Sequence, residues 1–143
     1  MQTKNQIRQS GFTLVEIMIV VSIIALLAEI AVPSVLRARR RTQAAATLEI
    51  LKTIDGATDQ WAIENGGKTG QTVPSLKLAA YIKKGTKLYN DLVSTSGLAY
   101  DSLGRQIAAA AVDNPPQVPT QTYIDLGAVA DSTYWGPYYS SGS

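Results

Sequence analysis

An apolar segment near the start of the chain, residues 12–32, constrains this protein more than any other feature of its sequence. Its 21 residues include only two charged side chains, Glu16 and Glu29. As an α-helix the segment would be roughly 31 Å long, close to the thickness of the hydrocarbon layer of a bilayer. The segment therefore predicts a helix that crosses a membrane.

Glu16 is unusual in such a helix because it is only the fifth residue of the apolar segment. A carboxylate near the centre of a bilayer costs about 2.5–3.5 kcal/mol, and somewhat less near the edge, where it reaches the headgroups. Charged residues that are kept inside membranes usually serve a function and have a partner. Glu16 is therefore a candidate functional residue.

The residues around Glu16 form a distinctive pattern. A short polar leader with two basic residues, Lys4 and Arg8, is followed by Ser-Gly-Phe-Thr-Leu-Val-Glu at positions 10–16. Pro33 stands 22nd when counting starts at Phe12. This combination resembles the processing site of the type IV pilin and type II secretion pseudopilin family. The specific part of the resemblance covers about the first 25 residues, and beyond it only the architecture is similar.

The resemblance implies a role for four residues. In that family a membrane peptidase cuts after the Gly and methylates the new N-terminal Phe, which implies cleavage between Gly11 and Phe12 and N-methylation of Phe12. Glu16 is implied to pair with the terminal amine of an adjacent subunit during assembly. Pro33 has no amide proton and crowds the carbonyl of residue 29, so a helix kink is expected there.

The resemblance also implies partners and a location. The partners are prepilin peptidase, an inner-membrane assembly platform, copies of the chain, other pilin-like subunits, and membrane lipid before assembly. The chain would be a single-pass protein of the bacterial inner membrane, with a cytoplasmic N-terminus and a periplasmic C-terminal domain. After assembly it would lie in a periplasmic or extracellular filament.

Helical sequence continues beyond Pro33 to about Glu64. Apolar or small residues recur there at steps of three and four, as expected for one face of a helix. This predicted stripe consists of Leu48, Leu51, Ile54, Thr58 and Trp61. We expect one long helix with a membrane half and an amphipathic half, and the rest of the chain packed on the stripe.

Residues 65–143 alternate short apolar stretches with turn residues. Residues 74–84 predict a short helix that ends at Gly85, and residues 120–126 predict one or two helical turns. Residues 98–101 and 105–109 flank Ser-Leu-Gly and predict a hairpin, and residues 134–139 predict an edge strand.

The predicted fold class is therefore α+β and pilin-like. A long N-terminal helix packs against a small C-terminal domain that contains short helices and an antiparallel β-sheet. The expected divisions are a leader at 1–11, a transmembrane and assembly half at 12–32, an amphipathic half at 33–64, and a globular part at 65–143.

Composition argues against an enzyme. The chain has no Cys and no His, which removes thiol nucleophiles, imidazole bases and nearly all zinc-site chemistry. No cofactor is expected. Pseudopilins often bind calcium in a C-terminal loop, but Asp113, Asp125 and Asp131 lack a recognisable ligand spacing, so no metal residue is assigned and calcium stays an alternative.

The net charge of +2 does not indicate a nucleic-acid partner. Loss of Lys4 and Arg8 with the leader leaves 11 basic residues against 11 acidic ones. A cluster of four arginines, at positions 37, 39, 40 and 41, would lie beyond the membrane. Three interpretations of this cluster are open: contact with lipid phosphates, contact with acidic neighbours, or no contact, as on a solvated helix face.

Two functions remain open. The leading hypothesis is a pilin-like structural subunit of a type II secretion pseudopilus or type IV pilus. The alternative is a membrane-anchored binding module that does not polymerise and uses its Tyr/Trp-rich C-terminal end, although those aromatic side chains could equally cover the long helix. Glu16 favours the first hypothesis because a simple anchor has no use for it.

Overall fold

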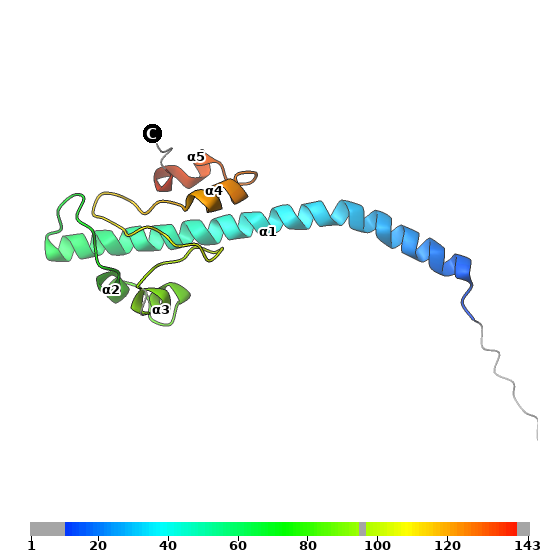
Figure 1. Ribbon diagram of the computed structural model, residues 1–143, viewed down its shortest axis with the longest axis horizontal. Helices are drawn as coiled ribbons and strands as arrows, with labels where there is room; N and C mark the ends of the chain where they lie inside the picture. The colour runs from blue at the N-terminus through cyan, green and yellow to red at the C-terminus, as the bar shows by residue number, and fades with distance from the viewer. Residues whose placement is uncertain (1–10, 95–96, 140–143) are drawn as a thin grey trace, which may run out of the picture. The chain divides into compact units, whose positions relative to one another are not determined.

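The computed structural model describes residues 11–94 and 97–139. The helices in these ranges are α1 (Leu14–Asn65), α2 (Ser75–Leu78), the 3-10 helix η1 (Ala79–Tyr81), α3 (Lys87–Val93), α4 (Thr120–Leu126), α5 (Ser132–Trp135) and the 3-10 helix η2 (Gly136–Tyr138), shown in Figure 1. The chain divides into two compact units, one that ends at Leu36 and one that begins at Arg37. The prediction of one long N-terminal helix followed by short helices is confirmed.

The described part of the first unit consists of a short non-helical stretch, residues 11–13, and the beginning of α1. Every side chain from 11 to 36 is exposed. The described part of this unit, residues 11–36, therefore has no core of its own.

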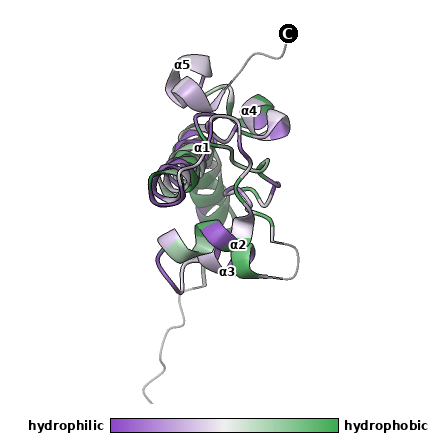
Figure 2. Cartoon of the chain, turned by 90° about the vertical axis from the view of Figure 1, so that its left-hand side faces the viewer, coloured by the Kyte–Doolittle hydropathy of each residue, from purple (hydrophilic) through white to green (hydrophobic). Residues whose placement is uncertain are grey.

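The second unit is built around the C-terminal half of α1. Helices α2 and α3 lie on one side of α1, and α4 and α5 lie on the other, as Figure 1 and the end view of Figure 2 both show. Irregular segments run along α1 between these two groups of helices (Figure 1). The core of this unit therefore forms around α1.

The buried face of α1 matches the predicted stripe. Leu51, Ile54 and Thr58 are buried, and Leu48 and Trp61 are half-buried against the core. The sequence analysis missed Ala44 and Thr47, which extend the same face toward the N-terminus and are also fully buried. The prediction of a packing stripe on α1 is thus confirmed.

The C-terminal aromatic residues cover this face. Trp135 is fully buried, and its indole Nε1 donates a hydrogen bond to the Ala130 carbonyl at 3.2 Å. The Tyr138 hydroxyl donates to Asp55 Oδ2 on α1 at 3.1 Å. Burial raises the pKa of Asp55 above its usual range despite this bond. These contacts attach the end of the chain to α1.

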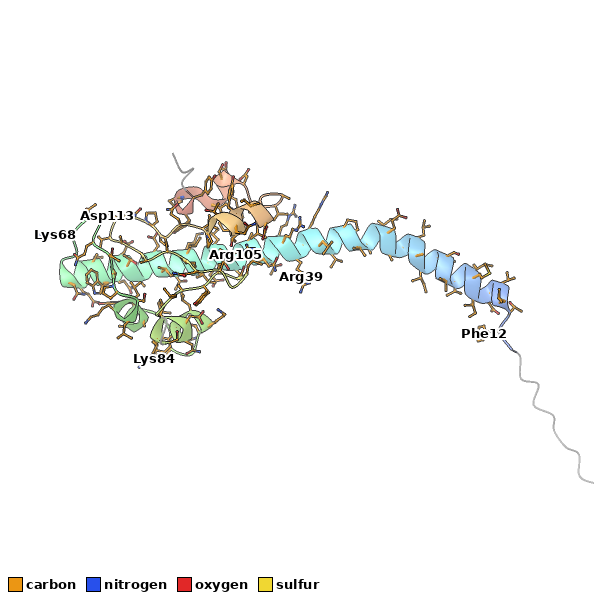
Figure 3. All side chains as sticks on the ribbon, viewed as in Figure 1. Phe12, Arg39, Lys68, Lys84, Arg105 and Asp113 are labelled. Carbon is orange, nitrogen blue, oxygen red and sulfur yellow. The ribbon has the colours of Figure 1, made fainter. Side chains whose placement is uncertain are left out.

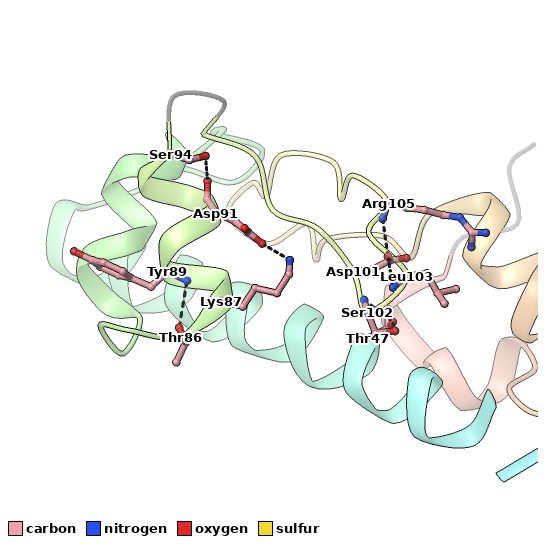
Figure 4. Close-up of polar contacts among 10 residues, drawn as sticks. All are labelled: Thr47, Thr86, Lys87, Tyr89, Asp91, Ser94, Asp101, Ser102, Leu103 and Arg105. Carbon is pink, nitrogen blue, oxygen red and sulfur yellow. Dashed lines mark hydrogen bonds and ion pairs between the residues drawn. The ribbon is translucent and has the colours of Figure 1, made fainter. Parts of the chain in front are cut away.

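A buried carboxylate joins two parts of the second unit, the turn at 101–105 and α4. Asp101 Oδ1 accepts hydrogen bonds from the Leu103 amide at 2.9 Å and the Arg105 amide at 2.8 Å, which closes the turn seen in Figure 4. Asp101 Oδ2 accepts from the hydroxyl of Thr122 on α4. These donors give both oxygens of the buried carboxylate hydrogen-bond partners in place of water.

The neighbouring residue anchors the same turn to α1. The Ser102 hydroxyl shares a hydrogen bond of 2.7 Å with Thr47 Oγ1 and donates to the Gln43 carbonyl at 2.8 Å. The Ser102 amide also donates to Thr47 Oγ1 at 3.3 Å (Figure 4). Thr47 is therefore buried with its hydroxyl hydrogen-bonded to the exposed Ser102.

The predicted antiparallel β-sheet is wrong for the described residues, which contain no strand. Antiparallel pairing is limited to isolated bridges between Thr72 and Ala111, Tyr100 and Gln106, and Ala111 and Asn114. The predicted hairpin forms only as a turn, in which the Asp101 amide donates to the Arg105 carbonyl at 2.9 Å and Ile107 donates to Ala99 at 2.9 Å.

The absence of strands there has a local cause. Residues 108–111 are four alanines, which have low β-propensity, and prolines at 115, 116 and 119 remove amide donors from the following stretch. Two positions with positive φ, Gly104 and Asp113, interrupt the extended backbone on either side of the alanines. Pairing therefore stops after single bridges.

Two further segments differ from expectation because capping residues start helices. Thr86 Oγ1 accepts from the Tyr89 amide at 3.2 Å and begins α3, which the sequence analysis did not predict (Figure 4). Asp131 Oδ1 accepts from the Tyr134 amide at 2.9 Å and begins α5, where an edge strand was expected. The predicted helical turns at 120–126 are confirmed as α4.

The stripe on α1 can be tested in a fragment that begins at Arg37. We expect Leu51→Ala to lower the free energy of unfolding by about 2–5 kcal/mol, because it leaves a cavity in the core. Ile63→Ala is a matched control on the same helix, since Ile63 is 83% exposed, and should change it by no more than about 0.5 kcal/mol. Denaturant titration followed by tryptophan fluorescence measures both, and equal effects would contradict the assigned core.

Candidate processing and assembly segment

The Gly11–Phe12 junction lies in exposed, non-helical chain immediately before α1. The Phe12 side chain is 78% exposed and lies near the start of α1 (Figure 3). A Cβ atom placed on Gly11 would meet nothing within 4 Å. A peptide bond in this setting is open to an enzyme, and a larger residue at position 11 would not disturb the described fold.

Thr13 caps the first turn of α1. Its Oγ1 accepts a hydrogen bond from the Glu16 amide at 3.2 Å, and its carbonyl accepts from the Ile17 amide at 3.3 Å. A helix begins with amides that lack partners, and a threonine hydroxyl satisfies one of them. The sequence analysis missed this role, although Thr-x-x-Glu at positions 13–16 is the pattern of a capping box.

Glu16 lies in the first turn of α1, where a negative charge is favourable because the helix dipole is positive at its N-terminus. Its side chain is exposed and makes no hydrogen bond or ion pair with any other described residue. The fold of the chain thus uses the Glu16 amide and leaves the carboxylate available for a partner.

Pro33 lies inside α1, which continues on both sides of it. The next residue, Ser34, turns its hydroxyl back and donates to the Ala31 carbonyl at 2.8 Å. Prolines and back-bonded serines both bend helices. The kink at Pro33 remains a prediction, and Ser34 provides a second reason to expect it.

α1 is long and apolar enough to cross a membrane, and none of its most apolar stretch is buried inside the molecule. Large apolar side chains, such as Leu14, Ile24 and Ile30, are 60–76% exposed. Water is an unfavourable environment for so much apolar surface. The segment therefore needs an external cover of lipid or protein.

The aromatic C-terminal end offers little free surface for recognition. Trp135 and Tyr138 are buried, and Tyr123 stacks on Tyr139 with 4.0 Å between ring centroids, both half-buried. Tyr134 is 40% exposed. Four of these five rings thus lie in the core of the second unit or pack against it.

The acidic residues considered for calcium each have a separate partner. Asp113 Oδ2 accepts from the Thr69 hydroxyl at 2.6 Å, Asp131 caps α5, and Asp125 forms an ion pair with Arg105. The residues that the structure describes contain no group of three side chains able to hold a metal ion.

Hydrogen bonds from Arg105 and Gln121 hold the pKa of Asp125 below its usual value of 3.8.

The lowered pKa of Asp125 predicts a pH dependence of stability. A carboxylate whose pKa is lower in the folded state stabilises the fold above its unfolded value near 3.8, and this contribution is lost as pH falls through the folded pKa. We expect Asp125→Asn to lower the free energy of unfolding at pH 7 in the fragment that begins at Arg37. At pH 3 the same substitution should lower it by less. Denaturant titrations at both pH values measure this difference, and a larger loss of stability at pH 3 than at pH 7 would contradict the prediction.

Comparison with known proteins adds one match. Residues 7–28 match the family model described as the prokaryotic N-terminal methylation motif. No curated protein and no solved structure matches the chain. The exposed Gly11–Phe12 junction, the capped start of α1 and Glu16 all lie within the matched residues. The chain thus carries the prokaryotic N-terminal methylation motif, the hallmark of type IV pilin and pseudopilin precursors.

Proposed function

We propose that this chain is a structural subunit of a type II secretion pseudopilus or type IV pilus filament. In this proposal prepilin peptidase cuts it after Gly11, and it assembles from the inner membrane. The observation that carries the proposal is an apolar helical segment without any cover of its own, which follows an open Gly-Phe junction inside a methylation motif.

Each division of the chain has a role in this proposal. Residues 1–11 form the leader, and residues 12–32 anchor the precursor in the membrane and later form the filament core. Residues 33–64 carry the packing stripe, and residues 65–143 cover that stripe. The N-terminus is cytoplasmic and the C-terminal domain is periplasmic.

Cleavage creates a problem of charge at the start of α1. The new amine of Phe12 is positive and lies next to the N-terminus of a helix, where the dipole is also positive. The amine must leave water when the helix enters a filament core, at a cost of several kcal/mol for an unpaired charge. A carboxylate partner is therefore required, and N-methylation leaves this charge in place.

Glu16 provides that carboxylate. It has no partner within its own described chain, so it is free to pair with the Phe12 amine of an adjacent subunit. An ion pair in a low-dielectric core recovers much of the desolvation cost of both charges and favours one axial register between neighbours. On assembly, the apolar side chains around Glu16 leave the lipid and pack against the same segment of other copies.

The alternative, a membrane-anchored binding module, has less support. Its expected ligand surface was the aromatic end of the chain, but Trp135 and Tyr138 are buried. A simple anchor also gives no reason for Glu16. The methylation motif belongs to structural proteins, which likewise favours a subunit over an enzyme.

Processing is the first test. We expect the mature protein in native membranes to begin with N-methyl-Phe12, as measured by mass spectrometry of the N-terminal peptide. Gly11→Val should block this because a β-branched side chain hinders the approach of the peptidase. A Cβ at position 11 meets nothing within 4 Å, so the described fold leaves room for a side chain there.

Two results would contradict the processing step. One is an N-terminal peptide that still begins at Met1, or one that begins near Glu29. The other is normal cleavage of the Gly11→Val variant in cells that contain the peptidase.

Assembly is the second test. We expect Glu16→Ala to insert and to be cleaved normally, but to enter filaments poorly, because the Phe12 amine would be buried without a partner. Loss of one member of a buried ion pair costs about 3–5 kcal/mol, which corresponds to roughly two to four powers of ten in subunit addition. The measurement compares cleaved protein in membranes with protein in sheared filaments. Glu16→Asp should be intermediate because its charge remains but its reach is shorter.

The matched control is Glu29→Ala, which also removes a carboxylate from the apolar helix. Glu29 lies 13 residues further along α1, or about 20 Å, too far to replace Glu16. The ion-pair mechanism is wrong if Glu16→Ala protein enters filaments at the wild-type level in cells without the wild-type subunit.

A further inference from the structure

Four arginines follow the apolar part of α1 directly. They begin at the residue after Leu36, at positions 37, 39, 40 and 41, and all four are exposed. Figure 3 shows the Arg39 side chain pointing away from the helix. Neither the packing of the second unit nor the proposed filament role uses these charges.

The described residues of the chain do not neutralise the charges of this cluster. The ion pairs among the described residues are Lys87 with Asp91 and Arg105 with Asp125. Arg40 contributes weakly to the lowered pKa of Asp125, for which Arg105 is the main cause. Arg37, Arg39 and Arg41 make no hydrogen bond or ion pair with any described residue, so these three guanidinium groups are available to a partner.

The spacing of the arginines fits a layer of phosphates. Arg37 to Arg41 span about 6 Å along a helix, and the headgroup layer on each side of a bilayer is roughly 5–8 Å thick. Arg37, Arg40 and Arg41 share one face at steps of three and four, whereas Arg39 projects from the other side. The helix can therefore meet phosphates around most of its circumference.

We propose that Arg37, Arg39, Arg40 and Arg41 form a binding surface for the phosphate groups of anionic phospholipids. Guanidinium groups bind phosphate oxygens through paired hydrogen bonds, and the arginine stem packs on acyl chains while its head stays in the headgroup layer. The membrane orientation in the proposed function places this surface at the periplasmic leaflet. The cluster then holds the precursor at a defined depth until it is extracted for assembly.

The test uses the purified full chain in a neutral detergent, titrated with phosphatidylglycerol or with phosphatidylcholine. Native mass spectrometry measures the fraction of protein that retains one lipid. We expect the wild type to bind phosphatidylglycerol at least roughly tenfold more tightly than phosphatidylcholine. Higher ionic strength should reduce this preference, because salt screens exposed charges.

The matched variants change the same number of charges at two places. The first triple variant, Arg37→Gln/Arg39→Gln/Arg41→Gln, should lose most of the preference for phosphatidylglycerol, at least roughly tenfold. It keeps Arg40, which interacts electrostatically with Asp125. Lys52→Gln/Lys77→Gln/Lys84→Gln removes three exposed lysines from the same unit and should keep the preference. Lys4 and Arg8 are present in every variant, so their contribution to lipid binding is the same in each and does not affect the comparison.

Three results would overturn the proposal: equal binding of the two lipids by the wild type, a preference that does not respond to salt, or equal losses in the two triple variants. A fourth is arginine-dependent self-association in place of lipid binding, which would assign the cluster to acidic groups of a second copy. No peptidase or assembly machinery takes part in the measurement. A negative result would therefore contradict lipid binding by the arginines without contradicting the proposed filament role.

Discussion

The structure depends on one constraint, which is that no described residue of the chain covers the apolar part of α1. Every side chain from 11 to 36 is exposed, and most of them are apolar. Burial of apolar surface is worth roughly 25 cal/mol per Å², so the segment strongly favours any apolar environment over water. In the proposed function, lipid provides that environment for a single chain, and the same segment of other copies provides it in a filament. The proposed function follows from the ability of one helix to use both environments.

The second unit solves the opposite problem, because it has a helix face to cover and few residues with which to cover it. Small residues at positions 44, 47, 57 and 58 allow close approach to α1, and Leu51 and Ile54 fill the centre of the contact. Trp135 and Tyr138 supply large side chains from the other end of the chain. Asp101, with donors on both oxygens, joins the turn at 101–105 to α4, while Ser102 joins it to α1. Side-chain hydrogen bonds thus take over part of the role that a β-sheet was expected to play.

The two charged sites outside this core suggest how assembly is controlled. Glu16 and the arginine cluster both carry charges that the described chain leaves without strong partners. In the proposals above, the cluster binds lipid phosphates before assembly, and Glu16 gains a partner in the filament. Lipid phosphates and acyl chains surround the precursor, whereas a filament provides only protein groups. The cost of breaking these charge contacts opposes extraction from the membrane, and the new contact between Glu16 and an amine compensates for part of it.

Sequence alone determined the features that depend on local pattern. The apolar segment, the methylation motif around Gly11, Phe12 and Glu16, and the stripe at Leu51, Ile54 and Thr58 were all predicted, because helix periodicity and motif spacing are properties of neighbouring residues. The sheet was predicted wrongly, because strand formation depends on pairing between distant segments, and the alanines at 108–111 pair only at single bridges. Only the tertiary structure decided that the aromatic residues at 135 and 138 are core, and that Asp101 is a buried junction. Both outcomes depend on contacts with residues tens of positions away in the chain, which no local pattern records.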